Sequence, residues 1–247
     1  MSFQTDDDRS RTALRRREAL VAAGGAGAGL AWALARGPAA LAAASARPAA
    51  SCVLAREVME GPYWIENRLR RRDIRDGRPG LPLVLTLTIQ DAASCRAIRG
   101  ADVEVWHADA GGVYSGYTGA PSPGRDGHAT PNNRKRFLRG HQRSDARGRV
   151  TFVTIYPGWY PGRTPHVHVK VHVGGDVVHT GQVFFPDTTS RAVYRTGAYR
   201  SHGAQDTSNS RDGIYRAAGG RLAVARLARR RRRPGFTGTI ALAVNRG

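Results

Sequence analysis

The sequence is poor in several residue types, and each shortage excludes a class of protein. It has only two cysteines among 247 residues, too few for the zinc and iron–sulfur sites that are built from clustered thiolates. Its 19 acidic residues are outnumbered by 39 lysines and arginines, for a formal net charge of +20. Such a balance favours an acidic partner or a merely solvated, arginine-rich surface. No helix-turn-helix pattern or basic strand with interleaved aromatics is present, so no nucleic-acid partner is indicated.

The first 46 residues have the composition of an export leader rather than of a folded domain. Residues 16–20 read Arg-Arg-Glu-Ala-Leu, which resembles a twin-arginine signal, and a weakly apolar run rich in alanine and glycine follows. Ala42, Ala44 and Ala46 offer cleavage points between small residues. We predict export by the twin-arginine route to the cell envelope or the outside, with an uncleaved membrane anchor as the alternative. Beyond this leader no run is long and apolar enough to cross a bilayer.

The remainder of the chain divides into a short linker at 47–51 and one folded domain at 52–247. The two cysteines, Cys52 and Cys95, each lie at a turn-like junction just outside a predicted strand. An even pair of cysteines in an exported protein favours a disulfide. We therefore predict that these two residues are bonded to each other.

The folded domain is dominated by alternation of apolar and polar residues rather than by helical spacing. Residues 83–89 read Leu-Val-Leu-Thr-Leu-Thr-Ile, which puts four large apolar side chains on one face of a strand. Five further strands are predicted at 101–107, 150–155, 166–173, 177–185 and 237–244. Long irregular stretches at 116–136 and 188–220 interrupt them, and helix signals are weak. This pattern predicts an all-β fold, an antiparallel β-sandwich with long active-site loops and few helices.

Two histidines occupy alternate positions on one of the predicted strands. His166 and His168 are two residues apart and so point to the same face, about 7 Å apart at the backbone. Two imidazoles placed in this way can share one metal ion. The pair alone is a weak signal, because most such pairs are ordinary strand residues.

Two tyrosines follow turn-rich segments that lead towards this strand. Residues 156–165 read Tyr-Pro-Gly-Trp-Tyr-Pro-Gly-Arg-Thr-Pro and present Tyr160 just before the histidines. Residues 105–114 end a strand in a Gly-Gly turn that is followed by Tyr114. Taken singly, each tyrosine is most often a packed aromatic whose hydroxyl has a hydrogen-bond partner.

Taken together, these segments resemble the intradiol ring-cleavage dioxygenases, the family that includes catechol 1,2-dioxygenases and protocatechuate 3,4-dioxygenases. The chain is most similar to the exported, single-domain members. The matching stretches are 60–64 (Glu-Gly-Pro-Tyr-Trp), 71–75 (Arg-Arg-Asp-Ile-Arg), 103–114, 152–169 and Gln182. The resemblance covers residues 52–185 and, more loosely, the C-terminal strand.

The resemblance implies a metal centre made of four of these side chains. Tyr114, Tyr160, His166 and His168 would hold one non-heme Fe³⁺ ion per chain. Phenolate is a hard, anionic donor, which suits ferric iron better than ferrous iron or a soft metal. The resemblance also implies that Tyr160 leaves the metal when substrate binds and takes up a substrate proton.

Four more residues receive roles from the same resemblance. Arg163 would stabilise charge that develops on the ring carbon under attack, and Gln182 would be its polar partner in the pocket. Tyr63 and Trp64 would line the substrate mouth. The alternatives are a surface arginine, a structural strand glutamine and plain aromatic packing.

The predicted function is a non-heme Fe(III) dioxygenase that inserts both atoms of O₂ into a catechol and cleaves between the two hydroxylated carbons. Its products would be muconate-type diacids, and its partners the small catechol and O₂, with membrane contact only through the leader. One alternative is a non-catalytic β-sandwich module that binds a metal, an aromatic or a glycan. A second is a polyanion-binding protein that acts through its arginines. The particular catechol and the oligomeric state stay open.

Overall fold

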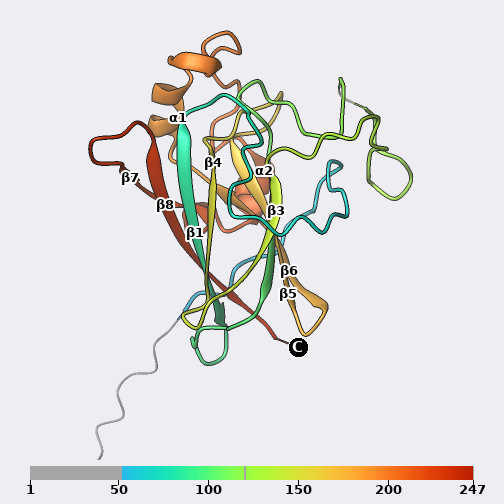
Figure 1. The fold of residues 1–247 in the computed structure, drawn as a ribbon, viewed down its shortest axis with the longest axis vertical. Helices are drawn as coiled ribbons and strands as arrows, with labels where there is room; N and C mark the ends of the chain where they lie inside the picture. Colours follow the sequence, from blue (N-terminus) through green and yellow to red (C-terminus); the bar gives the residue numbers. More distant parts are fainter. Residues whose placement is uncertain (1–51, 120, 247) are drawn as a thin grey trace, which may run out of the picture. The chain divides into compact units, whose positions relative to one another are not determined.

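The computed structural model describes residues 52–119 and 121–246, which form two facing β-sheets (Figure 1). The predicted leader at 1–46 and linker at 47–51 lie outside the described residues. The first sheet has the strand order β4-β1-β8-β7 and the second the order β3-β2-β5-β6. The first sheet consists of β4 (Arg149–Ile155), β1 (Pro82–Asp91), β8 (Phe236–Val244) and β7 (Arg226–Arg229). The second consists of β3 (Arg139–Arg143), β2 (Asp102–Trp106), β5 (His166–Val173) and β6 (Asp176–Phe184).

The core lies between the sheets and is filled by the alternating apolar residues. On β1, Leu83, Leu85, Leu87 and Ile89 are all at most 1% exposed, while the residues between them are half-buried. The second sheet contributes its valines to the same cluster: Val103, Val105, Val167, Val169, Val171 and Val183. Burial of each such side chain stabilises the fold by about 1.5–3 kcal/mol. The predicted sandwich is therefore confirmed, with the predicted faces turned inward.

The strand pairing departs from a purely antiparallel arrangement at one place. β1 pairs in parallel with β8, from Leu83 opposite Phe236 to Asp91 opposite Val244, whereas the other strand pairs are antiparallel. Parallel neighbours need a long crossover connection. Here nearly the whole domain, from the end of β1 to the start of β8, serves as that connection.

The long return after β6 is partly helical rather than wholly irregular. It holds α1 (Asp187–Val193), η1 (Gly197–Tyr199), α2 (Gly213–Ala217) and η2 (Gly220–Ala223), all short, in agreement with weak helix signals. Among the described residues, none of the helices is long and apolar enough to cross a membrane.

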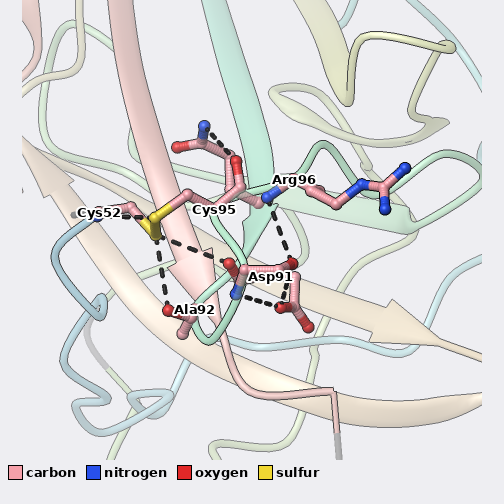
Figure 2. The surroundings of a disulfide bond; sticks show 7 residues. Cys52, Asp91, Ala92, Cys95 and Arg96 are labelled. Carbon is pink, nitrogen blue, oxygen red and sulfur yellow. Dashed lines mark hydrogen bonds between the residues drawn. A yellow bond between two sulfur atoms is a disulfide. The ribbon is translucent and has the colours of Figure 1, made fainter. Parts of the chain in front are cut away.

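The predicted disulfide is present and ties the start of the described chain to the turn that follows β1 (Figure 2). Cys52 and Cys95 are bonded, with their Cα atoms 5.5 Å apart. The turn is closed by hydrogen bonds around Asp91, whose carbonyl oxygen accepts from the Cys95 N–H at 2.8 Å. The Asp91 side chain also accepts from the Ser94 N–H at 2.8 Å.

The face of the second sheet that points away from the core is polar yet buried. His166 and His168 on β5 are each 2% exposed, and Lys170 is 7% exposed. Backbone hydrogen bonds hold the segment 57–74 against the sheet, including Val58 N–H to Thr180 O at 3.0 Å and His141 N–H to Leu69 O at 2.8 Å. The buried polar side chains beneath this cover are the predicted site.

Candidate metal centre

Three atoms from the predicted donor residues meet at one point above β5. The Tyr114 hydroxyl lies 3.2 Å from Nε2 of His166 and 3.0 Å from Nε2 of His168. The two Nε2 atoms are 3.1 Å apart. The three side chains are at most 3% exposed. The fold therefore brings three potential donors to one ion together, although Tyr114 precedes His166 by 52 residues and His168 by 54.

Both imidazoles are held in the neutral form that binds metals. Burial lowers the pKa of His166 to about 3, and burial followed by the neighbouring His166 lowers the pKa of His168 far below its ordinary value. Nδ1 of His166 donates to the carbonyl oxygen of Thr164 at 2.7 Å. Its Nε2 consequently carries a lone pair directed at Tyr114 and His168. The Tyr114 hydroxyl and neutral His168 can supply at most one proton each to the three mutual contacts, and Nε2 of His166 supplies none. A cation between the three atoms could satisfy all of them.

The fourth predicted donor, Tyr160, packs edge-on against this group. Its ring centroid is 5.8 Å from that of Tyr114 and 5.6 Å from that of His166. Burial raises the pKa of both phenols, and the positive charge of Arg163 partly opposes that shift. The phenols therefore need a strong cation close by before they ionise. In the described part of the chain, no group of three or more His, Cys, Asp or Glu side chains could hold a metal; the predicted donor set consists of two imidazoles and two phenols.

The turn that presents Tyr114 is organised by Asp109. The Asp109 carboxylate accepts from the N–H groups of Gly111 at 3.0 Å and Val113 at 3.1 Å, and its other oxygen pairs with Arg78. Asp and Asn side chains commonly close turns in this way. The Asp-Ala-Gly-Gly sequence at 109–112 is typical of such a turn, although the sequence analysis gave Asp109 no role.

The two tyrosine-bearing segments touch through backbone at two glycines. A Cβ atom on Gly158 would lie 2.0 Å from the Asp109 carbonyl oxygen. A Cβ on Gly112, whose φ is +81°, would lie 2.2 Å from the Trp159 carbonyl oxygen. Only glycine allows this approach. The approach brings the chain before Tyr114 against the chain before Tyr160.

Tyr160 and Arg163 are the first and last residues of a tight turn. Pro161 and Gly162, with φ of +81° at the glycine, fit the two central positions of a type II turn, and the Arg163 N–H donates to Tyr160 O at 3.0 Å. The turn returns the arginine side chain to the tyrosine, where Nη1 donates to the Tyr160 hydroxyl at 3.2 Å.

The predicted partner of Arg163 is also in place. Nη2 of Arg163 donates to Oε1 of Gln182, and Nε2 of Gln182 donates to the Met59 carbonyl oxygen at 3.3 Å. The third donor, Nε of Arg163, is bound by Asp212 at 2.8 Å. Sequence reasoning missed Asp212, which lies 49 residues further along the chain, in a segment without a regular pattern.

The two aromatics predicted at the substrate mouth have different surroundings. The Tyr63 ring stacks on Tyr114 with centroids 4.8 Å apart and lies edge-on to Tyr160 at 6.2 Å. Trp64 instead packs under Lys170, whose Nζ is 4.0 Å from its ring centroid, and its indole N–H donates to Glu104 at 3.1 Å. Tyr63 thus stacks directly on a predicted donor residue, and both Tyr63 and Trp64 pack against the buried cluster that contains Tyr114.

A buried arginine that the sequence did not single out lies beneath this aromatic cluster. Arg139 has no exposed surface and donates to the carbonyl oxygens of Tyr63 at 2.7 Å and Ser115 at 2.9 Å. Burial lowers its pKa to about 10, so it stays charged at neutral pH. Its charge opposes the rise in the pKa of Tyr114. Arg139 therefore both ties the covering segment to the Tyr114 loop and favours the phenolate.

Comparison with known proteins finds a family and a curated relative that this chain resembles. A family model described as Dioxygenase matches residues 59–187. The protocatechuate 3,4-dioxygenase beta chain of Burkholderia cepacia is 30% identical over 131 residues, which are 49% of this chain and 52% of that protein. The chain therefore spans about half the length of this curated relative.

Two solved structures share the fold over most of the chain. An intradiol ring-cleavage dioxygenase from Tetranychus urticae is 37% identical with a TM-score of 0.74, covering 78% of this chain and 95% of that one. The dioxygenase domain of a dioxygenase–carbohydrate-binding protein fusion from Streptomyces sp. SirexAA-E is 27% identical, with a TM-score of 0.56. That match covers 78% of this chain and 99% of that domain.

Proposed function

Because this chain belongs to the intradiol ring-cleavage dioxygenase family, we propose that it opens catechol-type rings with O₂ at a ferric centre. Both oxygen atoms would enter the product, a muconate-type diacid cleaved between the two hydroxylated carbons. The observation that carries the proposal is the convergence of the Tyr114 hydroxyl with Nε2 of His166 and His168 within 3.0–3.2 Å, with Tyr160 packed beside them.

The donor chemistry fits one ferric ion. Tyr114, Tyr160, His166 and His168 offer two hard phenolates and two neutral imidazoles, a set suited to Fe³⁺. Ionising two buried phenols is costly, as their raised pKa values indicate, and a trivalent cation can offset that cost. When bound, the ferric ion would draw electron density from a catechol and make its ring reactive towards O₂.

The surrounding side chains have distinct tasks in this scheme. The Tyr160 oxygen, 3.2 Å from Arg163 Nη1, would accept a proton from the substrate, and the Arg163 cation would stabilise its anionic form until then. Arg163 also supplies a fixed positive charge for the ring carbon under attack. The Tyr63 ring, stacked on Tyr114, gives a flat apolar wall against which an aromatic substrate can pack.

Oxygen uptake tests this proposal across a small panel: catechol, protocatechuate, hydroxyquinol and larger lignin-derived catechols. We expect consumption of one O₂ per ring opened, and a diacid that contains both oxygen atoms by mass spectrometry with ¹⁸O₂. A semialdehyde product would show cleavage beside, rather than between, the hydroxylated carbons and would overturn the mechanism. Binding of catechol without oxygen uptake by iron-loaded protein would favour a non-catalytic binding module instead.

A further inference from the structure

Asp212 is a buried carboxylate that joins three parts of the site region. Its side chain is 1% exposed. One oxygen, Oδ2, accepts from Arg163 Nε at 2.8 Å and from the Thr164 N–H at 3.0 Å. The other, Oδ1, accepts from the N–H groups of Ile214 at 2.8 Å and Tyr215 at 3.1 Å, at the start of α2. The two oxygens thus have separate partners: Oδ2 binds Arg163 and the Thr164 N–H, and Oδ1 caps the start of α2.

We propose that Asp212 is the positioning residue that fixes the Arg163 guanidinium over the reacting ring, an inference that rests on the proposed function. Arg163 has a fixed partner for each of its nitrogens: Asp212, Gln182 and Tyr160. Gln182 is neutral, and Tyr160, anionic only until it takes up the substrate proton, is expected to move during turnover. Asp212 is the partner that stays anionic and in place throughout turnover, and charge-assisted hydrogen bonds are roughly twice as strong as neutral ones.

The same oxygen also stabilises the turn that orients a predicted metal ligand. Thr164, whose N–H is bound by Asp212, uses its carbonyl oxygen to hold Nδ1 of His166 at 2.7 Å. This turn has a second anchor, since the Thr164 hydroxyl donates to Asn209 Oδ1 at 2.7 Å. Loss of the Asp212 carboxylate therefore leaves His166 supported and leaves Arg163 without its anionic partner.

The substitution Asp212→Asn separates the two oxygens. Asparagine is as good an N-cap as aspartate, so its carbonyl oxygen can still cap α2. Its amide nitrogen cannot accept a hydrogen bond from Arg163 Nε. Because a misplacement of about 1 Å can cost roughly 100-fold in rate, we expect kcat to fall about 10- to 100-fold. Iron content, and the affinity for catechol measured anaerobically by the change in visible absorption, should stay within about twofold of wild type.

A double-mutant cycle with Arg163→Gln tests whether Asp212 acts through the arginine. If it does, adding Asp212→Asn to Arg163→Gln should lower kcat by less than about twofold further. An equal loss in both backgrounds, or a loss confined to KM or to iron content, would overturn the proposal. Two control variants test other causes of a lower kcat, namely the loss of any carboxylate and the loosening of α2. Asp145→Asn makes the same change in an exposed ion pair, and Ile214→Ala loosens the packing of α2 without touching Arg163.

The four proteins of the cycle are wild type, Asp212→Asn, Arg163→Gln and the double variant. Their unfolding with urea gives a second readout that needs no turnover. Coupling between Arg163 and Asp212 should appear as a non-additive shift of the unfolding midpoint, and additive shifts would contradict the contact. If wild-type protein opens no catechol, the proposed function fails while the urea cycle still decides whether the carboxylate fixes the arginine. If wild type is active and the cycle is additive in both readouts, the positioning role alone fails.

Discussion

Replacing Gly158 with alanine tests directly how the proposed metal centre is assembled. The new Cβ would lie 2.0 Å from the Asp109 carbonyl oxygen, 2.8 Å from the Gly112 nitrogen and 3.0 Å from the Ala110 carbonyl carbon. All three are backbone atoms, so no side-chain rotation can relieve the contact. The segment before Tyr160 must move away from the segment before Tyr114.

The size of the effect follows from that contact. Lengthening the 2.0 Å contact to an ordinary 3.4 Å requires a shift of 1.4 Å (3.4 − 2.0), and a misplacement of about 1 Å is already enough to lower a catalytic rate roughly 100-fold. Overpacking of a buried site costs about 1–3 kcal/mol, and each kcal/mol lowers Tm by about 2–4 °C in a domain of this size. We expect Gly158→Ala to fold, to melt several degrees earlier and to lose most of its iron and activity.

The assay compares three quantities in purified proteins: iron per chain, Tm and oxygen uptake with the best catechol. Gly111→Ala is the matched control, because its Cβ would meet only Asp109 Oδ1 at an ordinary 3.5 Å in the same turn. Gly111→Ala should therefore keep its iron. The reasoning is refuted if Gly158→Ala retains iron and turnover as well as Gly111→Ala does.

Three other perturbations have definite expected outcomes. Tyr114→Phe removes a donor from the convergent trio, so bound iron and its visible absorption should fall sharply in metal analysis and spectra, while a full iron complement would count against Tyr114 as a ligand. Cys52→Ser opens a bridge between residues 43 positions apart and should lower the free energy of unfolding by about 3–4 kcal/mol; urea unfolding at an unchanged value would contradict this. Burial lowers the pKa of His107 to about 4 in the folded protein against 6.5 when unfolded. Its neutral form therefore contributes up to about 3 kcal/mol of stability above pH 6.5 that is lost as pH falls towards 4. His107→Gln should weaken this acid sensitivity in unfolding curves measured from pH 7 to pH 4, and identical pH profiles for the two proteins would exclude the effect.

The sandwich could be predicted because apolar residues alternate with other residues along its core strands. β1 and β5 alternate apolar and other residues over their lengths, and the six predicted strands are all present. The sequence did not predict β3, which reads Arg-Gly-His-Gln-Arg, or β7, which reads Arg-Leu-Ala-Arg. Both are sheet-edge strands whose pairing depends on a neighbour rather than on their own apolar residues.

The candidate site was predictable where a motif is local and missed where the contact is distant. The turn 160–163 carries Pro-Gly at its centre, and its geometry follows from those residues. Asp212 and Arg139 reach the site from remote segments through hydrogen bonds, and neither lies in a recognisable pattern. Trp64 follows Tyr63 directly, yet Lys170 and Glu104 hold it in a different environment, which adjacency in sequence does not reveal.

The visible absorption spectrum of the purified protein is the most direct test of a ferric site made by Tyr114, Tyr160, His166 and His168. Protein from iron-replete cells should contain one iron per chain and be red-brown, because ferric tyrosinate absorbs visible light. Its colour should change when catechol is added without O₂. A colourless, iron-free preparation from such cells, unchanged by added ferric iron and catechol, would contradict the account.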